Sequence, residues 1–250
     1  MPTNLLEQSS RASVLLCLML VTLGSCWTNL SPVRQAGSKL PTSRALPGKS
    51  LLNVEALTVT PDAVEPLSQV EAKEVNSERP FSKMPNPAAA PFRFGGNALE
   101  RERAISCLAA AQIYEAGDDP EGERAVAQVV LNRVRHPAYP PSVCGVVFQG
   151  AERVTGCQFT FTCDGAMQRI PPPAAWARAR AIAAEMLSGH VYSPVGYATH
   201  YHTDWVVPYW SNSLDKVVAV KTHLFFRWPG GWGRPASFRR SPSSTEPIIP

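Results

Sequence analysis

Two helical patterns separated by a short acidic turn place the strongest constraint on how this chain folds. The first covers residues 99–115, and the second begins after Asp119 and runs until Pro137 stops it. Asp119 is a preferred N-cap, Pro120 suits the first helical position, and acidic residues follow in the first turn. The sequence therefore predicts that Glu115, at the end of the first helix, faces the first turn of the second.

Glu115 also stands on an otherwise apolar stripe. Leu108, Ala111 and Glu115 share one face of the first helix by the helical period. Burial there would raise the carboxyl pKa, which is how a carboxylic acid stays protonated near neutral pH and donates a proton. The alternative interpretation is an exposed glutamate at a frayed helix end.

The remaining patterns predict an α+β fold, helix-rich in its first half and with a small β-sheet in its second. Val126, Val129, Val130 and Val134 form the apolar stripe of the second helix. Gln128 and Asn132 lie on the same helix away from this stripe, and we interpret both as structural residues. A short helix is expected in SVCGVVFQG and a long one in PPPAAWARARAIAAEMLSG. CQFTFTC is expected to be a short strand or extended loop, and VGYATHYHT and KVVAVKTHLFFRW to be strands.

A short apolar run near the N-terminus predicts export. Arg11 precedes ASVLLCLMLVTLG, which is shorter than the ~20 residues that a membrane-spanning helix needs. Residues 23–26 (LGSC) resemble a lipoprotein cleavage box, in which Cys26 would be acylated. We interpret residues 1–26 as a signal peptide or membrane anchor of a periplasmic or envelope protein, with cleavage, lipidation and retention left open.

Proline-rich text without a sustained period flanks the patterned region. Residues 27–97 are predicted to be a disordered linker, and residues 234–250 a disordered tail. The functional domain is then 98–233, an ordinary size for one domain. The net charge of +4 is modest and no long Lys/Arg run occurs, so nothing indicates nucleic acid as a partner.

The patterned region resembles the SleB-type cell wall hydrolases. The resemblance rests on YEAGDDPEGERAVAQVVLNRVRHPAYPPSVCGVVFQ, CQFTFTCDG and VGYATHYHTDWVVPYW. It implies a lysozyme-like catalytic domain that acts on peptidoglycan glycan strands and needs no cofactor or metal. Glu115 matches the family's essential glutamate. The turn EAGDDPEG is one residue shorter than the family's usual spacing, and Asp119 stands where a second glutamate is more usual.

The chemistry that the resemblance implies is cleavage of the MurNAc–GlcNAc bond by lytic transglycosylation. One carboxyl suffices, because Glu115 first protonates the leaving oxygen and then, as a carboxylate, assists the attack of the sugar's own 6-hydroxyl. Desolvation and the dipole of the following helix oppose each other at this carboxyl, and burial is expected to prevail and raise its pKa.

Other candidate substrate-binding residues follow from the same motifs. Gln158 and Phe159 match a Gln-Phe motif that would line the glycan groove, although Phe159 is equally interpretable as core. The His-Tyr segment offers polar rings for sugar hydroxyls, and exposed aromatic rings suit the apolar faces of pyranoses. The His-Tyr segment consists of His200, Tyr201 and His202, and the candidate stacking rings are Trp205, Tyr209 and Trp210.

The cysteines agree with an oxidising compartment. Four remain outside the leader, and four cysteines allow three pairings. We predict Cys157–Cys163, whose members flank one aromatic run, and Cys107–Cys144. A four-cysteine zinc site lacks the CxxC spacing.

Three other functions remain open at the level of sequence. A two-carboxylate muramidase would use Asp119 or Asp164 to activate water. A zinc-dependent peptidoglycan amidase or peptidase would use His200 and His202, which point to one face of a strand, with Asp204 or His223 as a further ligand. A non-catalytic wall-binding module is the third. The sequence gives no oligomeric state.

Overall fold

A computed structural model describes residues 63–153 and 156–249 of the chain. The predicted export segment and residues 27–62 of the predicted linker lie outside these residues. The α-helices are α1 (Gln69–Glu78), α2 (Ala98–Ala116), α3 (Pro120–Arg135), α4 (Val143–Val147) and α5 (Pro173–Leu187). The strands are β1 (His200–Thr203), β2 (Asp215–Val220) and β3 (His223–Arg227). The predicted α+β class is confirmed.

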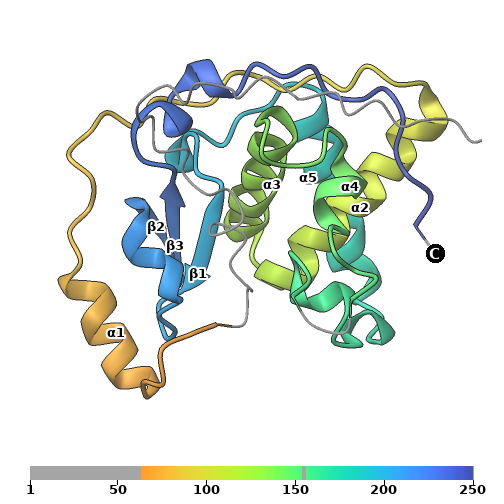
Figure 1. Ribbon diagram of the computed structural model, residues 1–250. Helices are drawn as coiled ribbons and strands as arrows, with labels where there is room; N and C mark the ends of the chain where they lie inside the picture. Colours follow the sequence, from red (N-terminus) through yellow and green to blue (C-terminus); the bar gives the residue numbers. More distant parts are fainter. Residues whose placement is uncertain (1–62, 154–155, 250) are drawn as a thin grey trace, which may run out of the picture. The chain divides into compact units, whose positions relative to one another are not determined.

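Helix α2 is the central helix of the helical part and carries Glu115 in its last turn. The Asn97 side chain caps its start by accepting from the N–H of Glu100 at 3.0 Å. Gly117, with a φ of 65°, ends it. Helices α3, α4 and α5 pack around α2 (Figure 1). Their buried apolar side chains form the main core, so the helix end that presents Glu115 is fixed by packing on three sides.

Helix α3 joins this helical layer to the sheet. Asp119 caps it as predicted, and the four valines of its stripe are fully buried. Gln128 and Asn132 are structural, as predicted: Asn132 donates to the backbone carbonyls of Gly196 and Ala198 at 2.9 and 2.8 Å. These bonds attach the segment that leads into β1 to the middle of α3.

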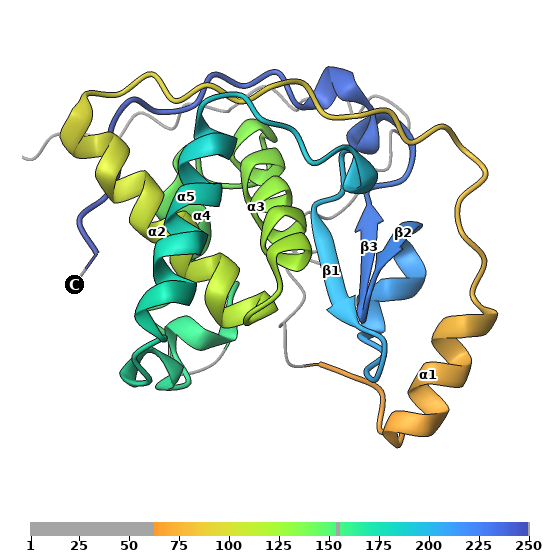
Figure 2. The same ribbon diagram turned by 180° about the vertical axis from the view of Figure 1, so that it is seen from behind.

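The sheet has three antiparallel strands in the order β1-β3-β2 (Figure 2). His200 pairs with Phe226 and Thr203 with His223, which fixes the register of β1. Phe225 of β3 and Val220 of β2 pack on Ala125 and Val129 of α3. Because side chains alternate along a strand, this register decides which residues of β1 face the helices.

CQFTFTC does not form a strand. Residues Thr160–Thr162 form a 3-10 helix, with Phe161 buried in the main core and stacked on Tyr114 at 4.9 Å between ring centres. The alternating phenylalanines therefore pack beside helices instead of in a sheet. Both predicted disulfides are confirmed: Cys107–Cys144 joins α2 to α4, and Cys157–Cys163 brackets the 3-10 helix.

The segment before α2 is ordered in its described part, contrary to the predicted linker through residue 97. A capping box between Ser68 and Glu71 opens α1. Asn76 donates to the carbonyls of Asp204 and Val206, and Lys216 donates to the carbonyl of Asn76. Polar side chains that satisfy backbone groups hold this segment beside the sheet. A search for apolar periodicity does not detect such contacts.

The predicted disordered tail is also wrong for residues 234–249. Arg240 donates to the carbonyls of Val134 and Pro140, at the end of α3 and in the following loop. The Glu246 carboxylate is buried and accepts from the N–H groups of Val143 and Cys144, which open α4. In the described part of the chain, no helix combines the length and apolarity needed to cross a bilayer.

Candidate functional site

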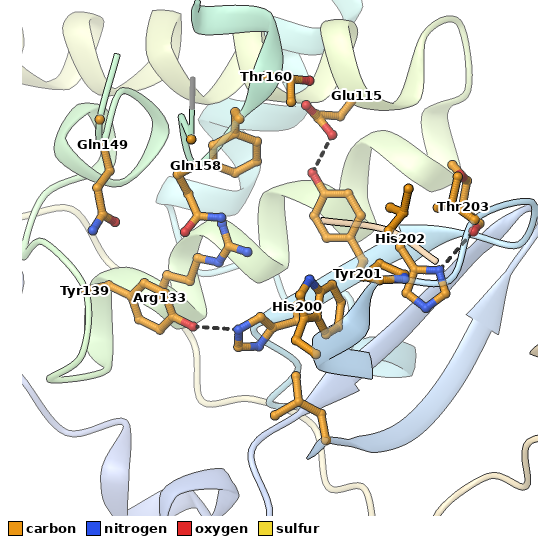
Figure 3. Close-up of a pocket in the computed structure, with 18 of the residues that line it drawn as sticks. Glu115, Arg133, Tyr139, Gln149, Gln158, Thr160, His200, Tyr201, His202 and Thr203 are labelled. Carbon is orange, nitrogen blue, oxygen red and sulfur yellow. Dashed lines mark hydrogen bonds between the residues drawn. The ribbon is translucent and has the colours of Figure 1, made fainter. Parts of the chain in front are cut away.

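A cavity of about 530 Å³ opens between the last turn of α2, the last turn of α3 and strand β1. Its volume is within the range of small-molecule sites. Most of the predicted site residues line it, as Figure 3 shows for those it labels. The predicted residues on its wall are Glu115, Gln158, Phe159, His200, Tyr201, His202 and Trp210.

Glu115 reaches the cavity from the last turn of α2. Its Oε2 accepts a hydrogen bond of 2.9 Å from the hydroxyl of Tyr201 on β1. Burial raises the pKa of the Glu115 carboxyl, and this effect outweighs the Tyr201 hydrogen bond and the positive charge of Arg133, which both lower it. The charge of Asp164 also raises this pKa. The surroundings of Glu115 therefore raise the pKa of this carboxyl, which is the direction that a proton donor requires.

Arg133 is a cavity residue that the sequence interpretation missed. It is only 3% exposed, and its Nε donates to the carbonyl of Thr199 at 2.6 Å. Its guanidinium lies over the rings of Tyr139 and Phe159, at 5.4 and 5.2 Å. A signal was present: Arg133 follows Val129 and Val130 on the apolar stripe of α3 by the helical period. An arginine near the C-terminal end of a helix is common, because it complements the helix dipole, so the residue type alone does not distinguish this position.

The two histidines of β1 are neutral rings bound to protein groups. Burial lowers the pKa of His202 to about 4 and the pKa of His200 well below its usual value. The His200 Nδ1 lies 3.0 Å from the Thr199 hydroxyl, and its Nε2 lies 3.4 Å from the hydroxyl of Tyr139. The His202 Nδ1 lies 2.9 Å from the carbonyl of Thr203. A zinc ion that bound His200 would have to displace one of its hydrogen bonds, whereas the Nε2 of His202 has no partner among the described residues.

Aromatic rings also line the cavity. Trp210 contacts both histidine rings, with ring centres 5.2 Å from His200 and 5.6 Å from His202, and Trp228 also lines the wall. Phe159 is 3% exposed and belongs to the core as well as to the wall. The wall thus combines apolar faces with polar ring atoms, which suits a sugar.

Some predicted residues lie elsewhere. Tyr209 is 56% exposed and is not on the cavity wall. Asp119 caps α3 and pairs with Lys221, also away from the wall. Asp164 is exposed and accepts from the N–H of Ala166 at 2.7 Å. Glu115 is the one carboxylate that the cavity wall contains within residues 63–153 and 156–249.

Comparison with known proteins finds a family model and curated relatives that are similar to this domain. Residues 117–226 match the family model described as Cell Wall Hydrolase, and Glu115 lies just before this range. The spore cortex-lytic enzyme of Halalkalibacterium halodurans is 32% identical over 123 residues, which cover 48% of this chain and 34% of that protein. The spore cortex-lytic enzyme of Bacillus subtilis is 30% identical over 123 residues, covering 48% and 36%. The chain thus spans about a third of the length of these relatives.

Two solved structures are also similar. The catalytic domain of the Bacillus cereus SleB protein is 25% identical, with a TM-score of 0.42, over 54% of this chain and 95% of that one. The catalytic domain of the germination-specific lytic transglycosylase SleB from Bacillus anthracis is 27% identical, with a TM-score of 0.41, over 50% and 95%. The family match confirms the resemblance that the sequence motifs carry.

Proposed function

Because residues 117–226 carry a Cell Wall Hydrolase domain, we propose that this protein cleaves the MurNAc–GlcNAc bond of peptidoglycan glycan strands. The proposed reaction is lytic transglycosylation with Glu115 as the only acid and base. The curated relatives are named for action on spore cortex, but this chain shares about a third of their length, so cortex is not assigned as its substrate.

The state of Glu115 is the observation that carries this proposal. It is the one carboxylate on the described cavity wall, and burial raises its pKa. A raised pKa keeps a carboxyl protonated to higher pH, which is the property that a general acid needs. A single carboxylate supports a reaction in which one group serves as acid and then as base, since a two-carboxylate mechanism needs a second carboxyl within about 5–9.5 Å on the other side of the sugar.

The reaction then proceeds in two balanced steps. Glu115 gives its proton to the glycosidic oxygen while the bond from that oxygen to C1 of the muramyl sugar breaks, and the leaving sugar departs with a hydroxyl. The Glu115 carboxylate then takes the proton of the 6-hydroxyl as O6 bonds to C1, which closes a 1,6-anhydro ring and regenerates the acid. No water is consumed. Tyr201 holds the Glu115 oxygen in one orientation through both steps.

The other lining groups suit the glycan chain. Trp210 and the rings of His200 and His202 offer apolar faces to pyranoses, and Gln158 offers an amide to hydroxyl or N-acetyl groups. The zinc alternative has less support, because the ring nitrogens of His200 and the Nδ1 of His202 already have protein partners. For the muramidase alternative, Asp164 has more support than Asp119, since its charge acts on Glu115.

The products of digestion test the proposal. Purified protein is incubated with peptidoglycan, and the soluble fragments are identified by mass spectrometry. We expect 1,6-anhydro-MurNAc ends, which Glu115→Gln abolishes while the circular dichroism spectrum stays unchanged. Reducing MurNAc ends that Asp164→Asn removes would establish a muramidase instead. Cleaved stem peptides together with loss of activity in EDTA would establish the zinc enzyme.

We also propose an exported location in the cell envelope, with the N-terminus as a cleaved signal, a lipidated Cys26 or a retained anchor. The two disulfides support an oxidising compartment. Cell fractionation of the wild type and of Cys26→Ser distinguishes the forms. Loss of membrane association in the variant alone identifies lipidation, and cytoplasmic recovery of the wild type would contradict export.

A further inference from the structure

Arg133 has donor groups that the protein leaves unused. Its Nε bonds to Thr199, but within the described residues its Nη1 is buried without a hydrogen-bond partner. The side chain is 3% exposed and lines the cavity that holds Glu115 (Figure 3). A buried arginine normally has its donors paired, because leaving a charged donor unpaired is costly. Nη2 has no hydrogen bond to a described residue either and, unlike Nη1, it is not closed off from the cavity, so a ligand in the cavity can bind the guanidinium through Nη2.

The charges around Arg133 indicate that this ligand is an anion. Among the described lining residues, the charged side chains are Glu115, Arg133 and Arg153. Two arginines thus face one carboxylate, whose pKa burial raises, and burial lowers the pKa values of the wall histidines His200, His202 and His223. No carboxylate of the described chain lies within ion-pair distance of Arg133. The empty cavity is thus positive, and a positive cavity with apolar walls attracts and concentrates anions.

The guanidinium is also held in one position. The Thr199 carbonyl fixes Nε at 2.6 Å, and the rings of Tyr139 and Phe159 lie 5.4 and 5.2 Å from the guanidinium carbon. An arginine fixed in this way loses little side-chain entropy when a carboxylate binds to it. It also lies where water is largely excluded, so a charge-assisted hydrogen bond there is strong.

We propose that Arg133 binds the free lactyl carboxylate of a muramyl residue, so that the enzyme selects glycan strands from which stem peptides have been removed. This inference rests on the proposed action on glycan strands. A lactyl group is attached directly to the sugar ring, so it reaches a nearly buried guanidinium when the sugar occupies the cavity. In a strand that carries its peptides, the same position is a neutral amide carbonyl, which pairs more weakly with arginine.

A substrate carboxylate bound to Arg133 would also change the pKa of the catalytic acid Glu115. The charged and titratable groups that influence Glu115 are Tyr201, Arg133 and Asp164, and the Arg133 charge lowers its pKa. A substrate carboxylate on Arg133 compensates this charge, so Glu115 remains protonated more completely when a peptide-free strand is bound. The enzyme that supplies the preferred substrate is then one that hydrolyses the amide between the lactyl group and the stem peptide.

Binding to the inactive Glu115→Gln protein tests the inference without any cleavage. The ligand is a tetrasaccharide of alternating GlcNAc and MurNAc with free lactyl carboxylates, and the control ligand is its lactyl methyl ester. By calorimetry we expect the acid to bind at least about tenfold more tightly than the ester, as for a charge-assisted hydrogen bond. Equal affinities for the two would overturn the proposal.

Three further variants in this background separate Arg133 from general electrostatics. Arg133→Gln should abolish the preference for the acid, and Arg133→Lys should keep part of it. Arg153→Gln removes the other arginine of the wall, whose side chain is 66% exposed and screened by water, and should leave the preference for the acid nearly unchanged. Loss of the preference in Arg153→Gln but not in Arg133→Gln would contradict the assignment. The comparison of acid and ester on the Glu115→Gln protein stands even if Arg133→Gln fails to fold.

A third ligand distinguishes the source of the carboxylate. The same tetrasaccharide carrying stem peptides has carboxylates only on its peptides. We expect it to bind about as weakly as the methyl ester. Binding as tight as that of the free acid would overturn the lactyl assignment. Failure of the tetrasaccharides to bind at all, together with release of stem peptides from peptidoglycan, would instead contradict the proposed function.

Discussion

Tyr201 of β1 donates its hydroxyl hydrogen to Oε2 of Glu115 across 2.9 Å, which links the sheet to the end of the helix α2. Burial and the neighbouring Glu115 raise the pKa of Tyr201 well above its usual value, so this hydroxyl keeps its proton. The bond favours the ionised form of Glu115 and opposes the larger effect of burial. Tyr201 therefore lowers the pKa of Glu115 in addition to orienting its side chain.

The variant Tyr201→Phe should shift the pH dependence of activity. Removing the donor removes an effect that lowers the pKa of Glu115, so this pKa rises further and the acid stays protonated at higher pH. We expect the basic limb of the kcat/KM profile to move to higher pH and the maximal rate to fall about tenfold, as for one hydrogen bond. Tyr209→Phe changes an exposed tyrosine outside the cavity and should leave the profile unchanged. A shift towards acid would contradict this role.

Glu115 should make the protein less stable as the pH rises. Its pKa in the folded state is raised above the ordinary value of 4.5, so the folded state holds the proton more strongly than the unfolded state does. This contribution is fully present below pH 4.5 and is lost as the pH rises through the folded pKa, at about 1.4 kcal/mol for each unit of the shift. Urea unfolding of Glu115→Gln should give a higher stability than wild type at pH 8 and a smaller difference at pH 4. A difference that grows on acidification would contradict the raised pKa.

Residues with a local signal could be placed from the sequence. Asp119 and Pro120 mark the start of α3 by capping chemistry, and the valine stripe of this helix is buried as its period predicts. Glu115 was singled out because an acid interrupted an apolar stripe, and it lies on the cavity wall. These features depend on neighbours within a few turns of one helix, which is the range that a sequence pattern describes.

Features that depend on distant partners could not be placed. Phe159 and Phe161 alternate as in a strand, but both are buried in the helical core. The disulfide and the packing against Tyr114 override the local preference for a strand. Asn76 and Arg240 hold their segments through hydrogen bonds to backbone carbonyls far away in sequence. Such bonds leave no periodic trace, so both segments were predicted to be disordered.

The two disulfides should have different effects when they are removed. Cys107–Cys144 closes a loop with a sequence separation of 37, so its loss should cost about 4 kcal/mol by loop entropy. Cys157–Cys163 has a separation of 6, so its loss should cost about 2 kcal/mol. The short loop, however, contains Gln158 and Phe159 of the cavity wall.

Double serine variants test this contrast by urea unfolding and by kinetics. Cys157→Ser with Cys163→Ser should raise KM, because it loosens the cavity wall, and should lower the free energy of unfolding less than the other double variant does. Cys107→Ser with Cys144→Ser should mainly lower stability, because it releases α2 from α4. The opposite assignment of the two effects would show that the short loop holds its shape without the bond.

The tail should stabilise α4 through Glu246. This buried carboxylate accepts from the N–H groups of Val143 and Cys144 at 3.1 and 2.7 Å. Glu246→Ala leaves both donors without the acceptor and should lower the free energy of unfolding by about 2 kcal/mol. Glu246→Gln keeps an acceptor oxygen and should stay within about 1 kcal/mol of wild type. Glu152→Ala, whose side chain is 74% exposed, is the matched control and should change nothing. Equal stability of the alanine variants at positions 246 and 152, measured by urea unfolding, would show that the tail does not support the helix.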